Sequence, residues 1–106
     1  MSLKKSLIEV KSLIDTPEKW CKYKYARDSS GIPVSYKSPR ACSFCILGAV
    51  RRVRIEEQLD VLRELRKFIP NKQTNRRNLK LNIFNDNATH NEVMALFDRA
   101  IKLTPE

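Results

Sequence analysis

Apolar residues recur every three or four positions along most of the chain, which predicts a mainly helical fold. The first helix is predicted at residues 2–15, where Leu3 and Leu7 share one face with later apolar residues. A second helix is predicted at residues 39–53, with Ser38 as its cap, Pro39 at its first position and an almost wholly apolar middle. Gly48 lies in that middle and would let another element approach closely.

The same period continues at residues 56–69, which we predict as a third helix that ends before Pro70. Its outer face carries Glu64 and Lys67, which are spaced to form an ion pair. The positions expected to face inward are Ile55, Leu59, Leu62, Leu65 and Ile69.

A fourth helix is predicted at residues 90–103. Thr89 followed three residues later by Glu92 is the S/T-x-x-E pattern of a capping box. The residues at 85–87, which include Asp86, are predicted to form a polar turn that caps this helix, although they could also form a recognition loop. Together with the helix at 39–53, this last helix should supply the centre of the core.

Between the first two helices the residue types change. A single helical turn is predicted after Thr16, and strand-forming residues at 22–27 and 32–36 flank the turn sequence DSSG, which predicts a short β-hairpin. Residues 79–83 alternate apolar and polar side chains, which fits either a short third strand or a buried irregular segment. The predicted fold is therefore mainly α: a compact four-helix single domain over residues 1–106, with a short β-hairpin packed against it.

The sequence argues against two classes of protein, membrane-spanning proteins and proteins with a signal peptide. The longest apolar run, residues 45–50, is far shorter than the ~18 residues that a membrane-spanning helix needs. The first ten residues alternate Lys and Glu with Leu and Ile, so we read no signal peptide and expect a cytoplasmic protein with no membrane partner.

The net charge of +9 is concentrated in the middle of the sequence, because residues 51–80 carry ten Lys or Arg and four acidic residues. This surplus indicates either an acidic partner or a solvated surface, which fit it equally well. The candidate basic face consists of Arg51, Arg52, Arg54, Arg63, Arg66, Lys67, Lys72, Arg76, Arg77 and Lys80. Arg predominates in this set and suits bidentate contacts with phosphate or carboxylate.

Three cysteines and one histidine could in principle form a Cys₃His zinc site from Cys21, Cys42, Cys45 and His90. The pair at 42 and 45 lies in an apolar sequence, so packing in the core is the favoured interpretation, and no metal or cofactor is expected. A Cys–His–Asp arrangement that includes Asp86 is conceivable, but no sequence motif supports it, and we predict no enzymatic activity.

Aromatic residues gather around the predicted hairpin. Trp20, Tyr23, Tyr25 and Tyr36 could stack on nucleic-acid bases. We favour the alternative that they form the face of the hairpin that packs against the helices.

Three sequence features together resemble a known family. They are Trp20-Cys21-Lys22, the run Cys42-x-x-Cys45-x-x-Gly48-Ala49, and Phe84-Asn85-Asp86 followed by the helix that ends in FDRAI. In this order they resemble a family of small bacterial and phage proteins of unknown function. The resemblance covers nearly the whole chain, with residues 54–78 matching only in being helical. It implies architecture and origin but no chemistry, and the dense basic segment is not part of it.

The function we expect is that of a non-catalytic small basic protein of bacterial or prophage type that binds an acidic macromolecule, with nucleic acid slightly favoured. The alternative is a phage accessory regulator or inhibitor that binds a host protein, for example by occupying its nucleic-acid-binding surface. Residues expected to serve the structure rather than binding are Trp20, Gly48, Asp86, Thr89 and Glu92.

Overall fold

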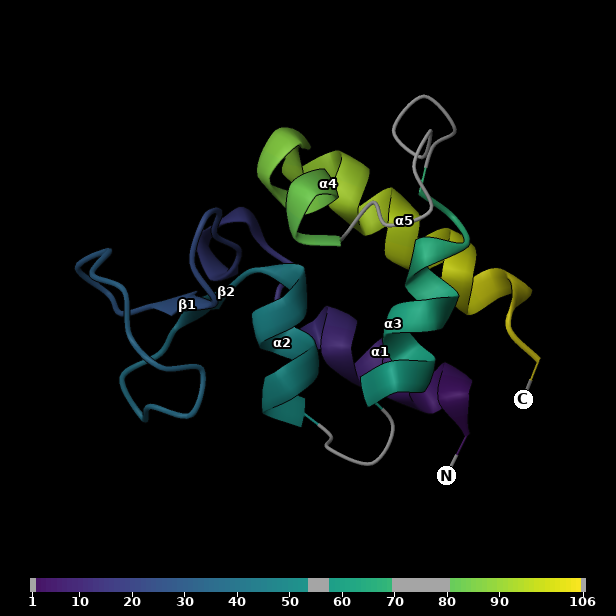
Figure 1. Ribbon diagram of the computed structural model, residues 1–106, viewed down its shortest axis with the longest axis horizontal. Coiled ribbons are helices and arrows are strands. Elements are labelled where there is room, and N and C mark those ends of the chain that lie inside the picture. Colours follow the sequence, from purple (N-terminus) through teal and green to yellow (C-terminus); the bar gives the residue numbers. More distant parts are fainter. Residues whose placement is uncertain (1, 54–57, 70–80, 106) are drawn as a thin grey trace.

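The computed structural model describes residues 2–53, 58–69 and 81–105, which form a mainly helical protein with a small antiparallel hairpin (Figure 1). The predicted fold class is confirmed, but the described residues contain five α-helices rather than four. The helices are α1 (Leu3–Ser12), α2 (Ile46–Val53), α3 (Gln58–Arg66), α4 (Leu81–Asn87) and α5 (His90–Leu103). A 3₁₀ turn, η1 (Pro17–Lys19), and two strands, β1 (Ala26–Arg27) and β2 (Ser43–Phe44), complete the described elements.

The helices enclose one apolar core. α1 packs against α2, α3 and α5, and α2 also contacts α3 and α4. Leu7, Leu65 and Phe97 are fully buried where these helices meet. The two predicted central helices both contribute, since Ile46, Ala49 and Val50 from α2 and Val93 and Ala100 from α5 are buried with them. Among the described helices, none is long and apolar enough to cross a membrane.

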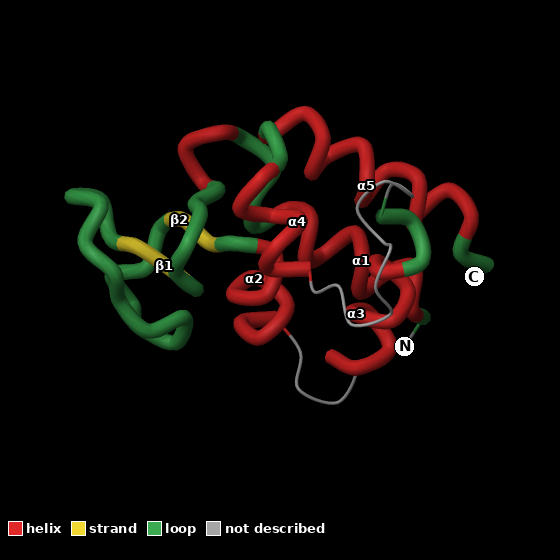
Figure 2. Tube along the Cα trace, turned by 45° about the horizontal axis from the view of Figure 1, so that its top comes forward, coloured by secondary structure: helices red, strands yellow, loops and turns green. Residues whose placement is uncertain are grey.

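The hairpin is shorter than predicted, and its second strand lies elsewhere. β1 pairs antiparallel with β2, and Ala26 lies opposite Phe44. The predicted partner segment at 32–36 contributes one isolated bridge, between Arg27 and Pro33. Figure 2 shows the two strands at one end of the molecule, joined directly to α2.

The start of α2 was predicted seven residues too early. Residues 39–45 are turn and strand because their backbone groups have partners outside a helix: the Cys42 N–H donates to the Arg27 carbonyl at 2.9 Å, and the Cys45 N–H donates to the Tyr25 carbonyl at 3.2 Å. The Ser38 hydroxyl accepts from the Arg40 N–H and closes a local turn rather than capping a helix.

The predicted strand or irregular segment at 79–83 is wrong over its described part, because residue 81 begins α4. The alternation suggested by the sequence is broken by Ile83, which is 45% exposed, while Leu81, Phe84 and Asn85 are buried at helical spacing. Residues 85–87 are consequently the last turn of α4 and not a polar turn ahead of α5.

The remaining helix predictions are largely confirmed. The Thr89 hydroxyl accepts from the Glu92 N–H at 3.1 Å and the Glu92 carboxylate accepts from the Thr89 N–H at 2.8 Å, so the capping box is present. The predicted ion pair between Glu64 and Lys67 forms at 3.1 Å. Leu59 was wrongly placed inward: it is 69% exposed, because the buried face of α3 follows Val61, Leu62 and Leu65 instead.

Candidate functional site

The residues that carry the family-like pattern meet at Asn85, which is completely buried in α4. Its Oδ1 accepts two hydrogen bonds, from the indole Nε1–H of Trp20 at 2.6 Å and from the first N–H of α2, at Ile46, at 3.1 Å. Its Nδ2 donates to the Cys21 carbonyl at 3.1 Å. One amide therefore joins the segment after η1, the start of α2 and the end of α4.

Cys45 and Gly48 explain why the Cys-x-x-Gly spacing suits the start of α2. The Cys45 sulfur accepts a hydrogen bond from the Gly48 N–H at 3.3 Å, as a helix-capping side chain does. A Cβ at Gly48 would lie 1.9 Å from the Tyr25 carbonyl oxygen, so no other residue fits there without movement of the backbone. Burial raises the pKa of the Cys45 thiol to about 11, which keeps the thiol neutral and unreactive.

Asp86 fixes an unusual backbone conformation at Tyr23. Its Oδ1 accepts from the Tyr23 N–H at 2.9 Å. Tyr23 has a φ of 74°, in the left-handed region that residues with a side chain rarely adopt. Its side chain is 70% exposed. Such strain persists only where surrounding contacts impose it, and it is found preferentially at functional sites.

A pocket of about 310 Å³ opens beside this strained residue. Residues from the hairpin side, the start of α2 and α4 line it: Tyr23, Lys24, Tyr25, Cys45, Leu47, Asn82 and Asp86. Its size is at the lower end of the range for small-ligand sites, and it combines aromatic and apolar walls with a carboxylate and an amide.

Tyr25 lies at the rim of the pocket within an aromatic and cationic cluster. Its ring contacts Tyr36 edge to face, with centroids 6.1 Å apart at 87°. The Arg51 guanidinium lies 5.2 Å from the centre of the Tyr25 ring. Tyr25 is nevertheless 45% exposed, so the prediction that the aromatic residues form a buried packing face is wrong for Tyr23 and Tyr25.

Trp20 does pack against the helices, as was predicted for all four aromatic residues around the hairpin. It is half-buried against the core and donates to Asn85. The His90 ring lies 5.7 Å from the Trp20 ring, and the Lys22 ammonium lies 5.5 Å from its centre. The His90 Nε2 is also 2.8 Å from the Ile14 carbonyl oxygen, which places this imidazole in a structural contact.

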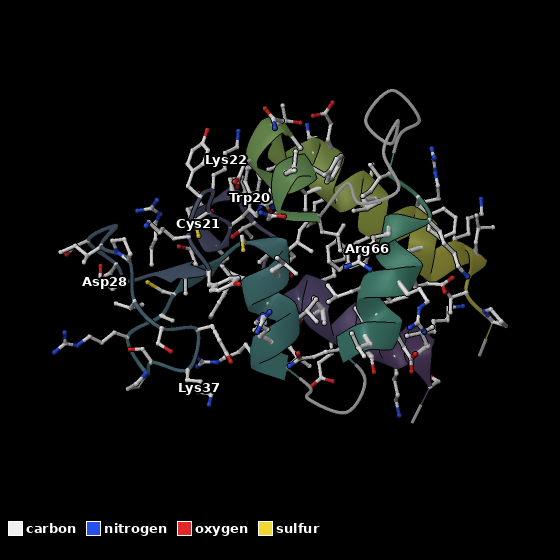
Figure 3. The ribbon with its side chains drawn as sticks, viewed as in Figure 1. Trp20, Cys21, Lys22, Asp28, Lys37 and Arg66 are labelled. Carbon is white, nitrogen blue, oxygen red and sulfur yellow. The ribbon has the colours of Figure 1, made fainter. Side chains whose placement is uncertain are left out.

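Positive charge is concentrated at the hairpin end of the molecule. We call residues 20–45 the hairpin lobe. The lobe and α2 together, residues 20–53, carry seven Lys or Arg and a single acidic residue, Asp28. The other described residues carry nine basic and eight acidic side chains. In Figure 3, Lys22 and Lys37 lie at this end, whereas Arg66 lies beyond α2 on α3.

The structure describes five of the ten residues of the predicted basic face. Arg51 stacks on Tyr25, and Arg52 donates to the carbonyls of Tyr36 and Ser38 at 2.7 and 2.9 Å, so both extend the hairpin lobe. On α3 Arg63 pairs with Asp60, and directly after the helix Lys67 pairs with Glu64, which neutralises much of that segment. The other predicted members, Arg54, Lys72, Arg76, Arg77 and Lys80, lie outside the described residues.

The cysteines and the histidine do not gather into one site. Cys21 and Cys45 are buried, Cys42 is exposed, and none of the three is in a disulfide. Within residues 2–53, 58–69 and 81–105, no group of three or more His, Cys, Asp or Glu is placed to hold a metal ion.

Sequence reasoning missed the pocket and the role of Asn85. Both depend on contacts between segments more than 60 positions apart, such as Tyr23 with Asp86. The sequence did contain one indication of the role of Asn85. Trp20 and Asn85 both belong to the family-like pattern, and each has a polar side-chain group that needs a hydrogen-bond partner when it is buried.

Comparison with known proteins identifies the chain at the level of its family only. No curated protein and no solved structure matches it. A family model does match almost from end to end, over residues 2–103. The chain therefore belongs to DUF6197, a family of unknown function, in agreement with the resemblance given by its sequence pattern.

Proposed function

We propose that this chain is a non-catalytic nucleic-acid-binding protein that binds single strands through the hairpin lobe and α2. The observation that carries the proposal is the exposure of Tyr23 and Tyr25 within the most basic part of the described surface. Neither feature alone indicates nucleic acid, but single-strand binding proteins combine a positive groove with aromatic side chains on which bases stack.

The charge distribution supports a polyanionic partner. Seven basic residues against one acid in residues 20–53 would attract phosphates, and binding would release counterions from the strand. The chain uses both kinds of cation here: Lys22, Lys24 and Lys37 are compact charges, whereas Arg51 can contact a phosphate while its guanidinium lies against Tyr25.

The tyrosines support a single strand over a duplex. Bases inside a duplex are stacked on each other and offer no free face, whereas unpaired bases can stack on an exposed ring. The backbone of Tyr23 is fixed by Asp86, and the ring of Tyr25 is ordered by its contacts with Tyr36 and Arg51. A ring that is already ordered, like that of Tyr25, loses little freedom when a base stacks on it.

The contacts of the described cysteines support a non-catalytic role. The Cys45 sulfur accepts the Gly48 N–H, and burial raises the pKa values of both Cys45 and Cys21, so neither is poised as a thiolate nucleophile. Free thiols at all three cysteines suit a reducing compartment, and we propose the cytoplasm of a bacterium, with a prophage as one possible source of the gene.

The test is equilibrium binding of a fluorescent twelve-nucleotide thymidine strand, and of a duplex of the same length, measured by anisotropy at two salt concentrations. The proposal predicts tighter binding of the single strand and an affinity that falls steeply between 50 and 200 mM salt, on the order of tenfold or more. Absence of binding at low salt, or a preference for the duplex, would contradict it. A tagged chain that then captured an acidic protein in a saturable, salt-sensitive complex would favour the alternative of a regulator that binds a host protein.

A further inference from the structure

We infer that the pocket beside Tyr23 is a base-reading site that prefers guanine in the bound single strand. The inference rests on the proposed function and adds specificity to it. Its starting point is the presence of a carboxylate, Asp86, in the wall of a pocket at the edge of a strongly basic surface. A carboxylate repels phosphates, so any direct contact of Asp86 with the strand would be made with the hydrogen-bond donors of a base.

Asp86 retains the capacity to do so. Its Oδ1 accepts from the Tyr23 N–H and from Asn85 Nδ2, at 2.9 and 3.1 Å. A carboxylate can accept about four hydrogen bonds, so these two contacts with described residues leave acceptor positions at the other oxygen. The same contacts fix the orientation of the carboxylate, which is the requirement for discriminating between bases.

The walls of the pocket suit a flat heterocycle. Tyr23 and Tyr25 provide aromatic surface, Leu47 and the buried Cys45 provide apolar surface, and Asn82 offers a second amide donor and acceptor. Lys24 also lines the pocket, and its ammonium could contact the adjacent phosphate or the carbonyl oxygen of a purine.

Guanine matches this set of groups best. On its Watson–Crick edge, N1–H and the 2-amino group are adjacent donors, which the two open positions of Asp86 Oδ2 could accept together, and O6 beside them is an acceptor for an ammonium or amide. Adenine and cytosine each offer one amino donor next to a ring acceptor, which the carboxylate would repel. Recognition of a base edge by two such hydrogen bonds discriminates by roughly tenfold.

The experiment uses nonanucleotides of thymidine in which only the central base varies: guanine, adenine, cytosine, thymine or hypoxanthine. The wild-type chain should bind the guanine strand roughly tenfold more tightly than the adenine, cytosine and thymine strands. The hypoxanthine strand should lose much of this gain, because it lacks the 2-amino group. Equal affinity for all five strands would overturn the inference while leaving the proposed function intact.

The variant Asp86→Asn separates recognition from folding. The side-chain oxygen of the introduced asparagine can still accept the Tyr23 N–H. Its amino group is a hydrogen-bond donor, however, and cannot accept from the N1–H and 2-amino donors of guanine. Asp86→Asn should therefore bind the guanine strand no more tightly than the all-thymine strand. Retention of the preference in this variant would also overturn the inference. Absence of binding to every strand by the wild-type chain would overturn the proposed function, and this inference with it.

Discussion

The side-chain oxygen of Asn85 lies 2.6 Å from the indole nitrogen of Trp20, across 65 positions of sequence. The same oxygen accepts the Ile46 N–H, so a single acceptor connects the hairpin lobe to two helices. Because a buried polar group without a partner costs free energy, this amide fixes how the lobe is placed against the helical body. The pocket depends on that placement, since its lining comes from both parts.

Substitution of Asn85 should therefore destabilise the whole fold. Asn85→Ala removes the partners of Trp20 Nε1–H, the Ile46 N–H and the Cys21 carbonyl, and we expect a loss of about 3 kcal/mol or more in the free energy of unfolding. Urea denaturation followed by tryptophan fluorescence would measure it. The matched control is Asn87→Ala in the same helix, where an exposed amide donates to the Ile83 carbonyl of its own helix, and this change should cost under about 1 kcal/mol. Equal losses in the two variants would contradict the role given to Asn85.

Glycine is required at Gly48 for a steric reason and at Gly31 for a conformational one, so alanine substitutions at the two positions should reduce stability by different amounts. At Gly48 a Cβ would collide with the Tyr25 backbone, so Gly48→Ala should cost at least about 2 kcal/mol. At Gly31 a Cβ would meet no atom within 4 Å, and only its φ of +83° opposes alanine, at about 1 kcal/mol. Thermal unfolding of both variants would show which substitution destabilises the chain more. A smaller loss of stability for Gly48→Ala than for Gly31→Ala would show that the contact with Tyr25 is misassigned.

The capping box predicts a specific cost at the start of α5. Thr89→Ala removes the acceptor for the Glu92 N–H and should destabilise the chain by about 1 kcal/mol. Thr16 precedes η1 but makes no capping hydrogen bond with its side chain, so Thr16→Ala is the matched control and should be nearly neutral. Equal shifts of the chemical denaturation midpoint in the two variants would contradict a stabilising role for the capping box.

Burial of Cys45 predicts a loss of stability in alkali. The pKa of its thiol rises from 9.0 to about 11 in the folded chain because burial disfavours the thiolate. Between these two values the folded chain holds a proton that the unfolded chain has released, so the free energy of unfolding should fall as pH rises through this window. Comparing the pH dependence with that of Cys45→Ser, whose hydroxyl does not titrate there, isolates this contribution. Identical slopes for the two proteins would contradict it.

Local patterns in the sequence were sufficient to predict much of the helical body. The capping box at Thr89 and Glu92 and the ion pair between Glu64 and Lys67 depend on residues three apart, so sequence spacing alone determines them. Helix α1 was likewise predicted from its apolar period. The expected membership of a family of unknown function is also confirmed, by the family model that covers residues 2–103.

The errors occurred where contacts between distant segments override local preference. Residues 39–45 look helical in isolation, but the carbonyls of Tyr25 and Arg27 accept their N–H groups and draw them into the hairpin. The contacts of the described basic residues in 51–80 could not be predicted either: Arg51 and Arg52 contact the hairpin lobe, and Arg63 and Lys67 pair with acidic residues. The pocket could not be predicted because three separate segments form it.

The central claim is that nucleic acid binds at the hairpin lobe and not simply to a positively charged chain. Two triple variants test it with equal changes in charge. One reverses three exposed residues of the lobe, Lys24→Glu, Lys37→Glu and Arg40→Glu. The other, called the α3 variant, reverses Arg63→Glu and Arg66→Glu on α3 and Lys67→Glu directly after it. Each reversal changes the net charge by two, so both triples differ from the wild-type chain by the same amount. All six side chains are exposed, and surface changes of this kind usually leave the fold intact.

The decisive measurement is the affinity of the two triple variants for a thymidine single strand at low salt, after circular dichroism has shown that both are folded. We predict that the lobe variant loses affinity by roughly tenfold or more and has a shallower salt dependence, because three phosphate contacts are lost. The α3 variant should stay within about threefold of the wild-type chain, since only long-range attraction changes. An equal loss in both variants, or a larger loss in the α3 variant, would contradict the placement of the binding surface on the hairpin lobe.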